Sequence, residues 1–258
     1  MSRPTSRRYF SNSRAMGVFR FLLVMLVLST ANAIQAATPP HRMLWAWEEP
    51  EDLRFLRSTD TGVAFLAASL LLRNDSVLVR FRRQPLLTNP GTFRMAVVRI
   101  ETDRKTRPRL SPAQSRKVEE IVLHVVSITG VSALQIDFDA TQSEWRFYRT
   151  LLAEMRSQLS TNVYISITAL TSWCTSQSWL PGIAADEVVP MLFRMGPDRE
   201  EVLSRVNHQG DFVVPQCRTS LGLSTDEPKI MIGKDRRLYY FAPRPWNAAA
   251  YNRILTDP

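Results

Sequence analysis

The sequence has few of the residues on which metal and thiol chemistry depends. Its 258 residues include three histidines and two cysteines. His41, His124 and His208 are isolated from one another, and His124 lies within an apolar helical pattern that suits a structural residue. The spacing of Cys174 and Cys217 fits no metal-binding motif. The chain therefore indicates no metal site and no cofactor.

Several motifs that identify common enzyme classes are absent as well. The chain has no G-x-S-x-G nucleophile elbow, no P-loop and no G-x-G-x-x-G turn. These absences argue against a serine hydrolase of the α/β type, a P-loop nucleotide hydrolase and a dinucleotide-binding enzyme.

Acidic residues are missing from the start of the chain, where much of the basic charge lies. The formal net charge is +9 and the pI is about 10.1, values that invite a nucleic-acid partner. Residues 1–36 hold five of the 33 basic residues and none of the 24 acidic ones, which leaves +4 for the rest. There the basic residues are scattered among acids, without a basic stripe or interleaved aromatics. The sequence therefore argues against nucleic-acid binding.

The first segment also lacks an apolar run long enough to span a membrane, which needs about 20 residues. A basic region is followed by an apolar run, residues 21–28, and by small residues that include Ala31 and Ala33. These parts are typical of a secretory signal peptide. We expect residues 1–36 to be this signal, residues 37–258 to be a single domain without a stable membrane span, and the mature protein to be periplasmic or secreted. An uncleaved anchor is the alternative. Residues 6–10 resemble a twin-arginine signal, so the export route is open.

Short apolar runs alternate with helical patterns over most of the remaining chain. Capping boxes predict helices after Ser111 and Thr141, and other patterns predict a short helix at 50–56 and a helix at 197–209. Residues 70–82 predict an extra hairpin after the second strand. The predicted strands are 42–47, 62–67, 93–101, 134–139, 163–168, 187–193, 218–224 and 238–241. This order predicts an α/β fold, a somewhat trimmed (β/α)8 TIM-like barrel, with an open doubly wound parallel sheet as the alternative.

The two cysteines conflict with this arrangement. In an exported chain they are expected to pair, and the bond would stabilise the fold by roughly 4 kcal/mol in the chain-entropy model. However, Cys174 follows the fifth predicted strand and Cys217 precedes the seventh, nominally at opposite ends of the barrel. A disulfide would require a misplaced strand boundary or a loop that folds back.

Polar side chains occupy one face of several predicted strands. Side chains alternate across a strand, so Asp137 and Asp139 share the face opposite to Leu134, Ile136 and Phe138. Barrel interiors are usually filled by Val, Ile and Leu, and buried polar groups are costly unless paired or wet. Barrel active sites are built at the carboxyl ends of the strands, where these acids gather. The pattern predicts a functional barrel mouth, with a purely structural polar network as the alternative.

Asp137 and Asp139 are the leading catalytic candidates. Their Cα atoms lie roughly 6.5 Å apart on a strand, and two close carboxylates raise the pKa of at least one of them. Such a pair can supply an acid and a base. Glu101 and Glu227 are further catalytic candidates at strand ends. Carboxylates with aromatic platforms suit a carbohydrate. The predicted substrate-binding residues are Trp45, Trp47, Glu48, Arg99, Tyr164, Trp173, Arg194 and Asp226, and Trp246 is another aromatic candidate.

Five segments carry a family resemblance: LWAWEEPEDLRFL, QIDFDAT, SITALTSWC, VPMLFRMG and LGLSTDEP. Together they are similar to an exported bacterial family known as a domain of unknown function, DUF3142. The resemblance covers nearly all of residues 37–258. It implies kinship and brings no activity with it.

The predicted fourth strand carries a more distant resemblance. Asp137 and Asp139 resemble the two aspartates of the D-x-D-x-E motif, which ends the fourth strand in the chitinase-like barrels of glycoside hydrolase family eighteen. In that family the glutamate protonates the leaving oxygen, but here Thr141 stands in its place, and a threonine hydroxyl cannot protonate a leaving group. The resemblance implies one of two functions. Either another carboxylate supplies the proton for polysaccharide cleavage, or the protein binds polysaccharide without cleaving it, in carbohydrate recognition or envelope assembly.

Overall fold

A computed structural model describes residues 38–57, 59–175, 179–196, 199–208, 211–228, 230 and 235–256. The predicted signal peptide, residues 1–36, lies outside the described residues. Among the described helices, none combines the length and the apolar character needed to cross a membrane.

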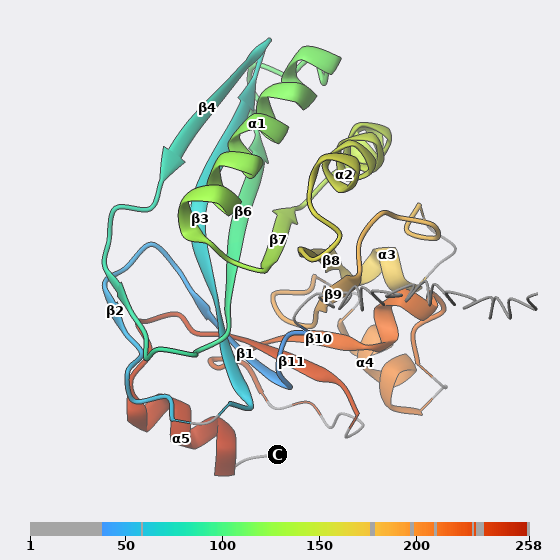
Figure 1. Cartoon of the computed structure of the whole chain (residues 1–258). Helices are drawn as coiled ribbons and strands as arrows, with labels where there is room; N and C mark the ends of the chain where they lie inside the picture. The colour runs from blue at the N-terminus through green and yellow to red at the C-terminus, as the bar shows by residue number, and fades with distance from the viewer. Residues whose placement is uncertain are drawn as a thin grey trace, which may run out of the picture. The chain divides into compact units, whose positions relative to one another are not determined.

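Eight parallel strands close into a barrel (Figure 1). Strand β1 pairs with both β3 and β11, and this double pairing closes the sheet. The closure confirms the predicted TIM-like barrel and excludes the open sheet. Around the barrel the strands are β1 (Arg42–Ala46), β3 (Thr61–Arg73), β6 (Arg94–Thr102), β7 (Ala133–Phe138), β8 (Tyr164–Leu170), β9 (Glu187–Met191), β10 (Ser220–Ser224) and β11 (Arg237–Phe241).

Only some of the described crossovers contain a long helix, in agreement with a trimmed barrel. Both long helices begin close to the predicted caps: the Ser111 hydroxyl accepts a hydrogen bond from the Gln114 N–H at 3.3 Å, and α1 ends at Gly130 with φ of 59°. The helices are α1 (Pro112–Thr129), α2 (Trp145–Gln158), α3 (Thr171–Thr175), α4 (Arg199–His208) and α5 (Ala248–Thr256), with 3-10 turns η1 (Gln142–Glu144) and η2 (Pro215–Arg218).

The predicted helix at residues 50–56 is wrong. Strand β2 (Glu51–Asp52) lies there and pairs in parallel with β5 (Leu86–Leu87). The Leu53 N–H continues this pairing by donating to the Leu87 carbonyl at 2.8 Å, and Leu53 is fully buried. Pairing with a segment more than thirty residues away thus overrides the local helical pattern, as tertiary contacts often do.

The predicted extra hairpin is confirmed. Strand β4 (Ser76–Phe81) turns back and pairs antiparallel with the end of β3. Asn74 in the turn adopts a positive φ of 48°, which asparagine tolerates better than most residues. Because β3 has 13 residues, it continues well beyond the end of β1, and β6 stays paired with it as far as Leu72.

Apolar side chains form two clusters, one outside the barrel and one inside it. Leu134, Ile136 and Phe138 of β7 belong to the outer cluster, which the helices cover. The inner cluster contains Trp45 and Tyr239 among others. Polar groups share the interior; the buried ones include Gln135, Asp137, Ser166, Thr168 and Glu187. The alternation predicted for the strands therefore holds.

Cys174 and Cys217 form a disulfide with a Cα–Cα distance of 5.9 Å. The strand boundaries are nearly as predicted, and the loop before η2 folds back onto α3, where the Val213 and Val214 N–H groups donate to the Cys174 carbonyl at 3.1 and 3.3 Å. Met191 of β9 pairs with Leu170, the last residue of β8, and also with Gly222, the third residue of β10. The carboxyl end of β8 therefore lies level with the middle of β10, and the folded-back loop brings Cys217 to Cys174.

Candidate functional site at the barrel mouth

A cavity of about 560 Å³ lies at the carboxyl ends of the strands, where TIM-barrel enzymes place their active sites. Side chains from the ends of six barrel strands and from α4 surround it. Six of the predicted site residues line this cavity: Trp45, Trp47, Arg99, Asp137, Asp139 and Arg194.

Asp137 is held firmly in the cavity wall. It is 3% exposed, and both carboxylate oxygens accept hydrogen bonds, from Arg99 Nη1 and Thr168 Oγ1, each at 2.7 Å. Burial acts to lower the pKa of Arg99, but the Asp137 and Glu101 carboxylates outweigh it and raise that pKa overall. Asp137 is thus a fixed carboxylate beside a permanent cation.

Asp139 has a different environment. It follows the last residue of β7, reaches solvent through the cavity and makes no hydrogen bond with a described residue. Enclosure by the cavity walls raises its pKa, the charge of Asp137 raises it further, and Arg99 opposes both effects. A carboxyl group with a raised pKa in a cavity is suited to donate a proton.

Two tryptophans form an aromatic side of the cavity. Trp45 is 1% exposed, and its indole N–H donates to Gln135 Oε1 at 2.8 Å. Trp47 meets it edge-on with ring centroids 4.4 Å apart, and the Arg99 guanidinium lies 5.9 Å above the Trp47 ring. The Trp45 ring is therefore held in place at the bottom of the cavity, whereas the half-buried Trp47 ring presents a flat surface next to the carboxylates.

Sequence reasoning missed further residues of the cavity. Phe241 packs 4.6 Å from Trp45, and Phe193 packs 4.7 Å from Phe241, measured between ring centroids. Phe241 could have been found, because it shares the inner face of β11 with Tyr239. No such signal marks α4, whose Glu201 and Arg205 also line the cavity. They form an ordinary i, i+4 ion pair, and only the fold shows that α4 borders the mouth.

Two predicted carboxylates lie near the mouth but do not line the cavity. Glu101 accepts from Arg99 Nε at 3.1 Å, and its side chain is 54% exposed. Glu48 pairs with Arg80 of β4 at 3.0 Å. Both carboxylates are thus engaged with arginines, Glu101 within β6 and Glu48 with β4.

Asp226 and Glu227 also lie outside the cavity lining, where they hold Arg194. Asp226 pairs with the Arg194 guanidinium at 3.2 Å, and Glu227 accepts from the Arg194 backbone N–H at 2.6 Å. Glu227 pairs with Arg199 as well. Arg194 has a left-handed φ of 49°, which is unfavourable for a residue with a side chain, and these contacts hold it there. Glu227 is therefore a support for the rim, contrary to its predicted catalytic role.

Tyr164 and Trp173 lie away from the cavity, contrary to prediction. Tyr164 is the first residue of β8, at the amino end of the barrel, where burial and the nearby Glu187 carboxylate raise its pKa to about 12. Trp173 is 4% exposed and packs against Trp179 in the outer cluster. Trp246 supports β1 through a hydrogen bond to the Trp45 carbonyl at 3.0 Å. These aromatic residues stabilise the barrel.

Thr141 caps the turn that begins α2 and does not line the cavity. Its N–H and hydroxyl both donate to Glu144 Oε2, at 2.7 and 2.8 Å. This capping box accounts for the residue that stands where the related hydrolase motif has its glutamate.

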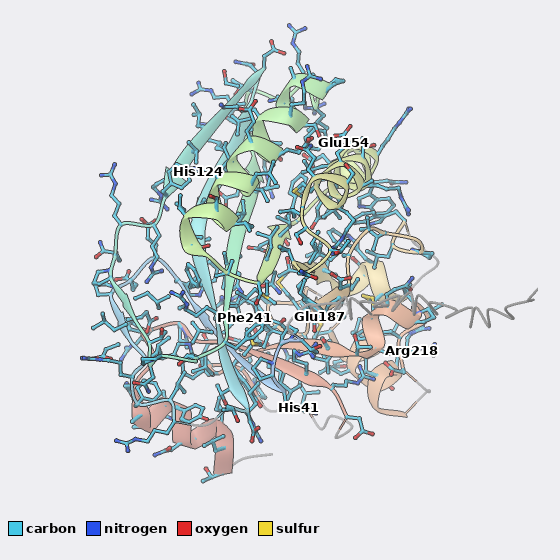
Figure 2. The ribbon with its side chains drawn as sticks, in the orientation of Figure 1. His41, His124, Glu154, Glu187, Arg218 and Phe241 are labelled. Atoms are coloured by element: carbon cyan, nitrogen blue, oxygen red, sulfur yellow. A yellow bond between two sulfur atoms is a disulfide. The ribbon has the colours of Figure 1, made fainter. Side chains whose placement is uncertain are left out.

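The described residues contain no group of three or more histidine, cysteine or carboxylate side chains that could hold a metal ion. His41, just before β1, and His124, in α1, lie well apart in Figure 2. His124 packs edge-on against Phe81, as a structural residue would.

Comparison with known proteins gives one family and one fold. The family model for a domain of unknown function, DUF3142, matches residues 90–190. This span includes QIDFDAT and SITALTSWC, so the predicted resemblance is confirmed there. A search of the curated proteins found no match.

Solved structures with a similar fold include a candidate chitinase A from Streptomyces coelicolor. The TM-score is 0.54 at 12% identity, over 83% of this chain and 94% of that one. The spore cortex-lytic enzyme SleL of Bacillus cereus (0.45, 14%, 73% and 51%) and the C-terminal domain of a candidate chitinase from Desulfitobacterium hafniense (0.45, 13%, 71% and 66%) give lower scores. The predicted resemblance to chitinase-like barrels is thus confirmed at the level of the fold.

Proposed function

We propose that this protein is an exported carbohydrate-active barrel that binds a polysaccharide at its mouth and hydrolyses it. One observation carries the proposal: in the cavity, Asp139 has a raised pKa and no hydrogen bond to a described residue, beside the fixed Asp137 and the flat face of Trp47. Aromatic faces stack on the apolar faces of sugar rings, and acids protonate glycosidic oxygens. Similarity to barrels named as chitinases supports the same class.

Each carboxyl group has a separate role in this proposal. Protonated Asp139 gives its proton to the oxygen of the departing sugar as the glycosidic bond breaks. Asp137, kept in place by Arg99 and Thr168, faces the positive charge that develops on the remaining ring. Water then adds to that ring and gives up a proton to the Asp139 carboxylate, which restores the acid, completes hydrolysis and leaves a new reducing end.

A second candidate function is polysaccharide binding without cleavage. The observation that favours it is Thr141, whose side chain is committed to capping η1 at the position of the motif glutamate. In this case Asp137 and Asp139 would only accept hydrogen bonds from sugar hydroxyls. The two candidates share a binding site and differ in chemistry.

The test uses purified protein lacking residues 1–36 and a panel of chitin, cellulose, alginate and bacterial envelope polysaccharides. Bound glycan and new reducing ends are measured in the same samples. Cleavage that disappears in Asp139→Asn but persists in the surface control Asp52→Asn supports the hydrolase. Binding without cleavage in the unmodified protein supports the second candidate. Neither binding nor cleavage across the panel would contradict both.

A further inference from the structure

Three strands stand above the cavity on one side. β3 and β6 stay paired as far as Leu72 and Thr102, whereas β7 pairs with β6 only as far as Ile100. β4 doubles back along the projecting part of β3. At about 3.3 Å per residue, β3 continues roughly 10 Å past the level of Phe138, the last residue of β7. Figure 1 shows β3, β4 and β6 reaching far beyond β1 and β11; we refer to residues 69–73, 76–80 and 99–102 as the wall.

A row of side chains runs from the candidate site onto the wall. Asp137 is paired in register with Arg99, Arg99 with Ser69, and Ser69 with Arg80. Residues paired across neighbouring strands project from the same face of a sheet. Ser69 and Arg80 therefore lie on the face that Asp137 and Arg99 present to the cavity. The sheet face that lines the cavity therefore continues onto the wall.

The next row on this face is partly apolar. Leu71 is paired with Glu101 on one side and with Leu78 on the other. Leu78 is 48% exposed, whereas Leu70 and Leu72, on the opposite face of β3, are buried in the outer cluster near α1. Along β3, one face of the wall is thus covered by a helix, and the other face of the wall carries an exposed apolar strip between charged groups.

We propose that this uncovered face of the wall extends the cavity into a site for a long polysaccharide chain. The inference rests on the proposed function and names its substrate as a polymer. Arg80 and Glu101 offer charged hydrogen-bonding groups, and Leu71 with Leu78 offers apolar contact for sugar rings. Arg80 also pairs with Glu48, next to Trp47, so the wall and the aromatic side of the cavity are joined. A chain held at Asp137 would continue over this surface.

Two adjacent residues of β4 provide a matched test. Leu78 and Val79 are 48% and 42% exposed and project from opposite faces of the wall. Leu78→Ser and Val79→Ser are made in the Asp139→Asn protein, so that bound chains stay intact. Binding is measured for the disaccharide and the octasaccharide of chitin, cellulose and alginate, and thermal unfolding checks that both variants fold equally well.

We expect the octasaccharide of one of the three series to bind more tightly than the disaccharide of the same series. Leu78→Ser should weaken octasaccharide binding about tenfold. Disaccharide binding should not change, and Val79→Ser should change neither. If the disaccharide and the octasaccharide bind equally well, or if both variants lose the same affinity, the wall does not bind the chain. The proposed function would still stand. Self-association of the protein that Leu78→Ser abolishes would assign the face to a second copy instead. Binding of none of these probes would contradict the proposed function and this inference together.

Discussion

At the amino end of the barrel interior, Arg237 faces Glu187, and at the carboxyl end Arg99 faces Asp137. Glu187 is 3% exposed and accepts hydrogen bonds from Arg237, from the Ser220 hydroxyl and from the Tyr239 hydroxyl at 2.7 Å. The Arg237 guanidinium also donates to the carbonyls of residues 39 and 40, at 3.0 Å each. The Arg237–Glu187 pair at the amino end is thus fully satisfied within the protein.

The carboxyl end contains a group that the amino end lacks. Asp139 stands beside the Arg99–Asp137 pair, faces the cavity and makes no hydrogen bond with a described residue. Figure 2 shows Glu187 deep among the strands, where it serves the fold. A polar barrel interior therefore does not by itself mark a functional site. What distinguishes the mouth is a titratable group that the protein leaves available to a ligand.

The largest effect should come from Asp139→Asn. If Asp139 supplies the proton, kcat should fall by about 10²–10⁴-fold while glycan binding is retained. Because the pKa of Asp139 is raised in the folded protein, its carboxylate is unfavourable there, so the variant should be no less stable. The rate of the unmodified protein should fall as the pH rises through that raised pKa, and the residual rate of the variant should lack this dependence.

The corresponding change at the amino end, Glu187→Gln, should affect stability alone. It leaves Arg237 buried without its counter-charge, and breaking a buried ion pair costs about 3 to 5 kcal/mol. Urea unfolding measures the loss, and the folded variant should cleave or bind glycan as before. A loss of activity larger than the loss of folded protein would show that the amino end takes part in function.

The sequence alone does not predict most of this contrast between the two ends of the barrel interior. Alternation sorted β7 correctly, because apolar Leu134 and Ile136 alternate with polar Gln135 and Asp137 in a strict period of two. The same alternation correctly predicts that Tyr164 points inward. It does not predict that Tyr164 lies at the amino end of the barrel, since the position along the barrel axis depends on the stagger of all the strands. The sequence predicts Asp226 and Glu227 at a strand end. Charged groups there can stabilise the rim of the mouth, as these two do, as well as form a binding site. Burial and pairing of charges are properties of the closed barrel.

A matched pair of smaller changes should sharpen the comparison. Thr168→Val at the mouth and Tyr239→Phe at the amino end each delete one hydroxyl that donates to a carboxylate at 2.7 Å. Either deletion should cost up to about 3 kcal/mol of unfolding free energy, the value of a hydrogen bond to a charged group. Only Thr168→Val should also lower kcat, because it frees one oxygen of Asp137. Equal effects on kcat would erase the distinction between the two ends.

The smallest effect concerns Glu51, behind the aromatic side of the mouth. Glu51 is 4% exposed, and burial raises its pKa to about 7 although the Trp246 N–H and Arg82 oppose the shift. A carboxyl group whose pKa is higher in the folded state adds stability below its unfolded pKa of 4.5, and that stability is lost as the pH rises toward 7. Allowing for partial solvent screening, the loss should be about 2 kcal/mol.

Glu51→Gln keeps an oxygen for the Trp246 N–H, at 2.9 Å in the unmodified protein, and removes the titration. The variant should therefore equal the unmodified protein near pH 4 and exceed it in unfolding free energy at pH 8, as measured by urea unfolding at both values. Parallel pH profiles for the two proteins would show that Glu51 is ionised in the folded state at neutral pH. In that case Glu51 would be a buried carboxylate whose charge is balanced by its neighbours, as Glu187 is at the amino end of the barrel.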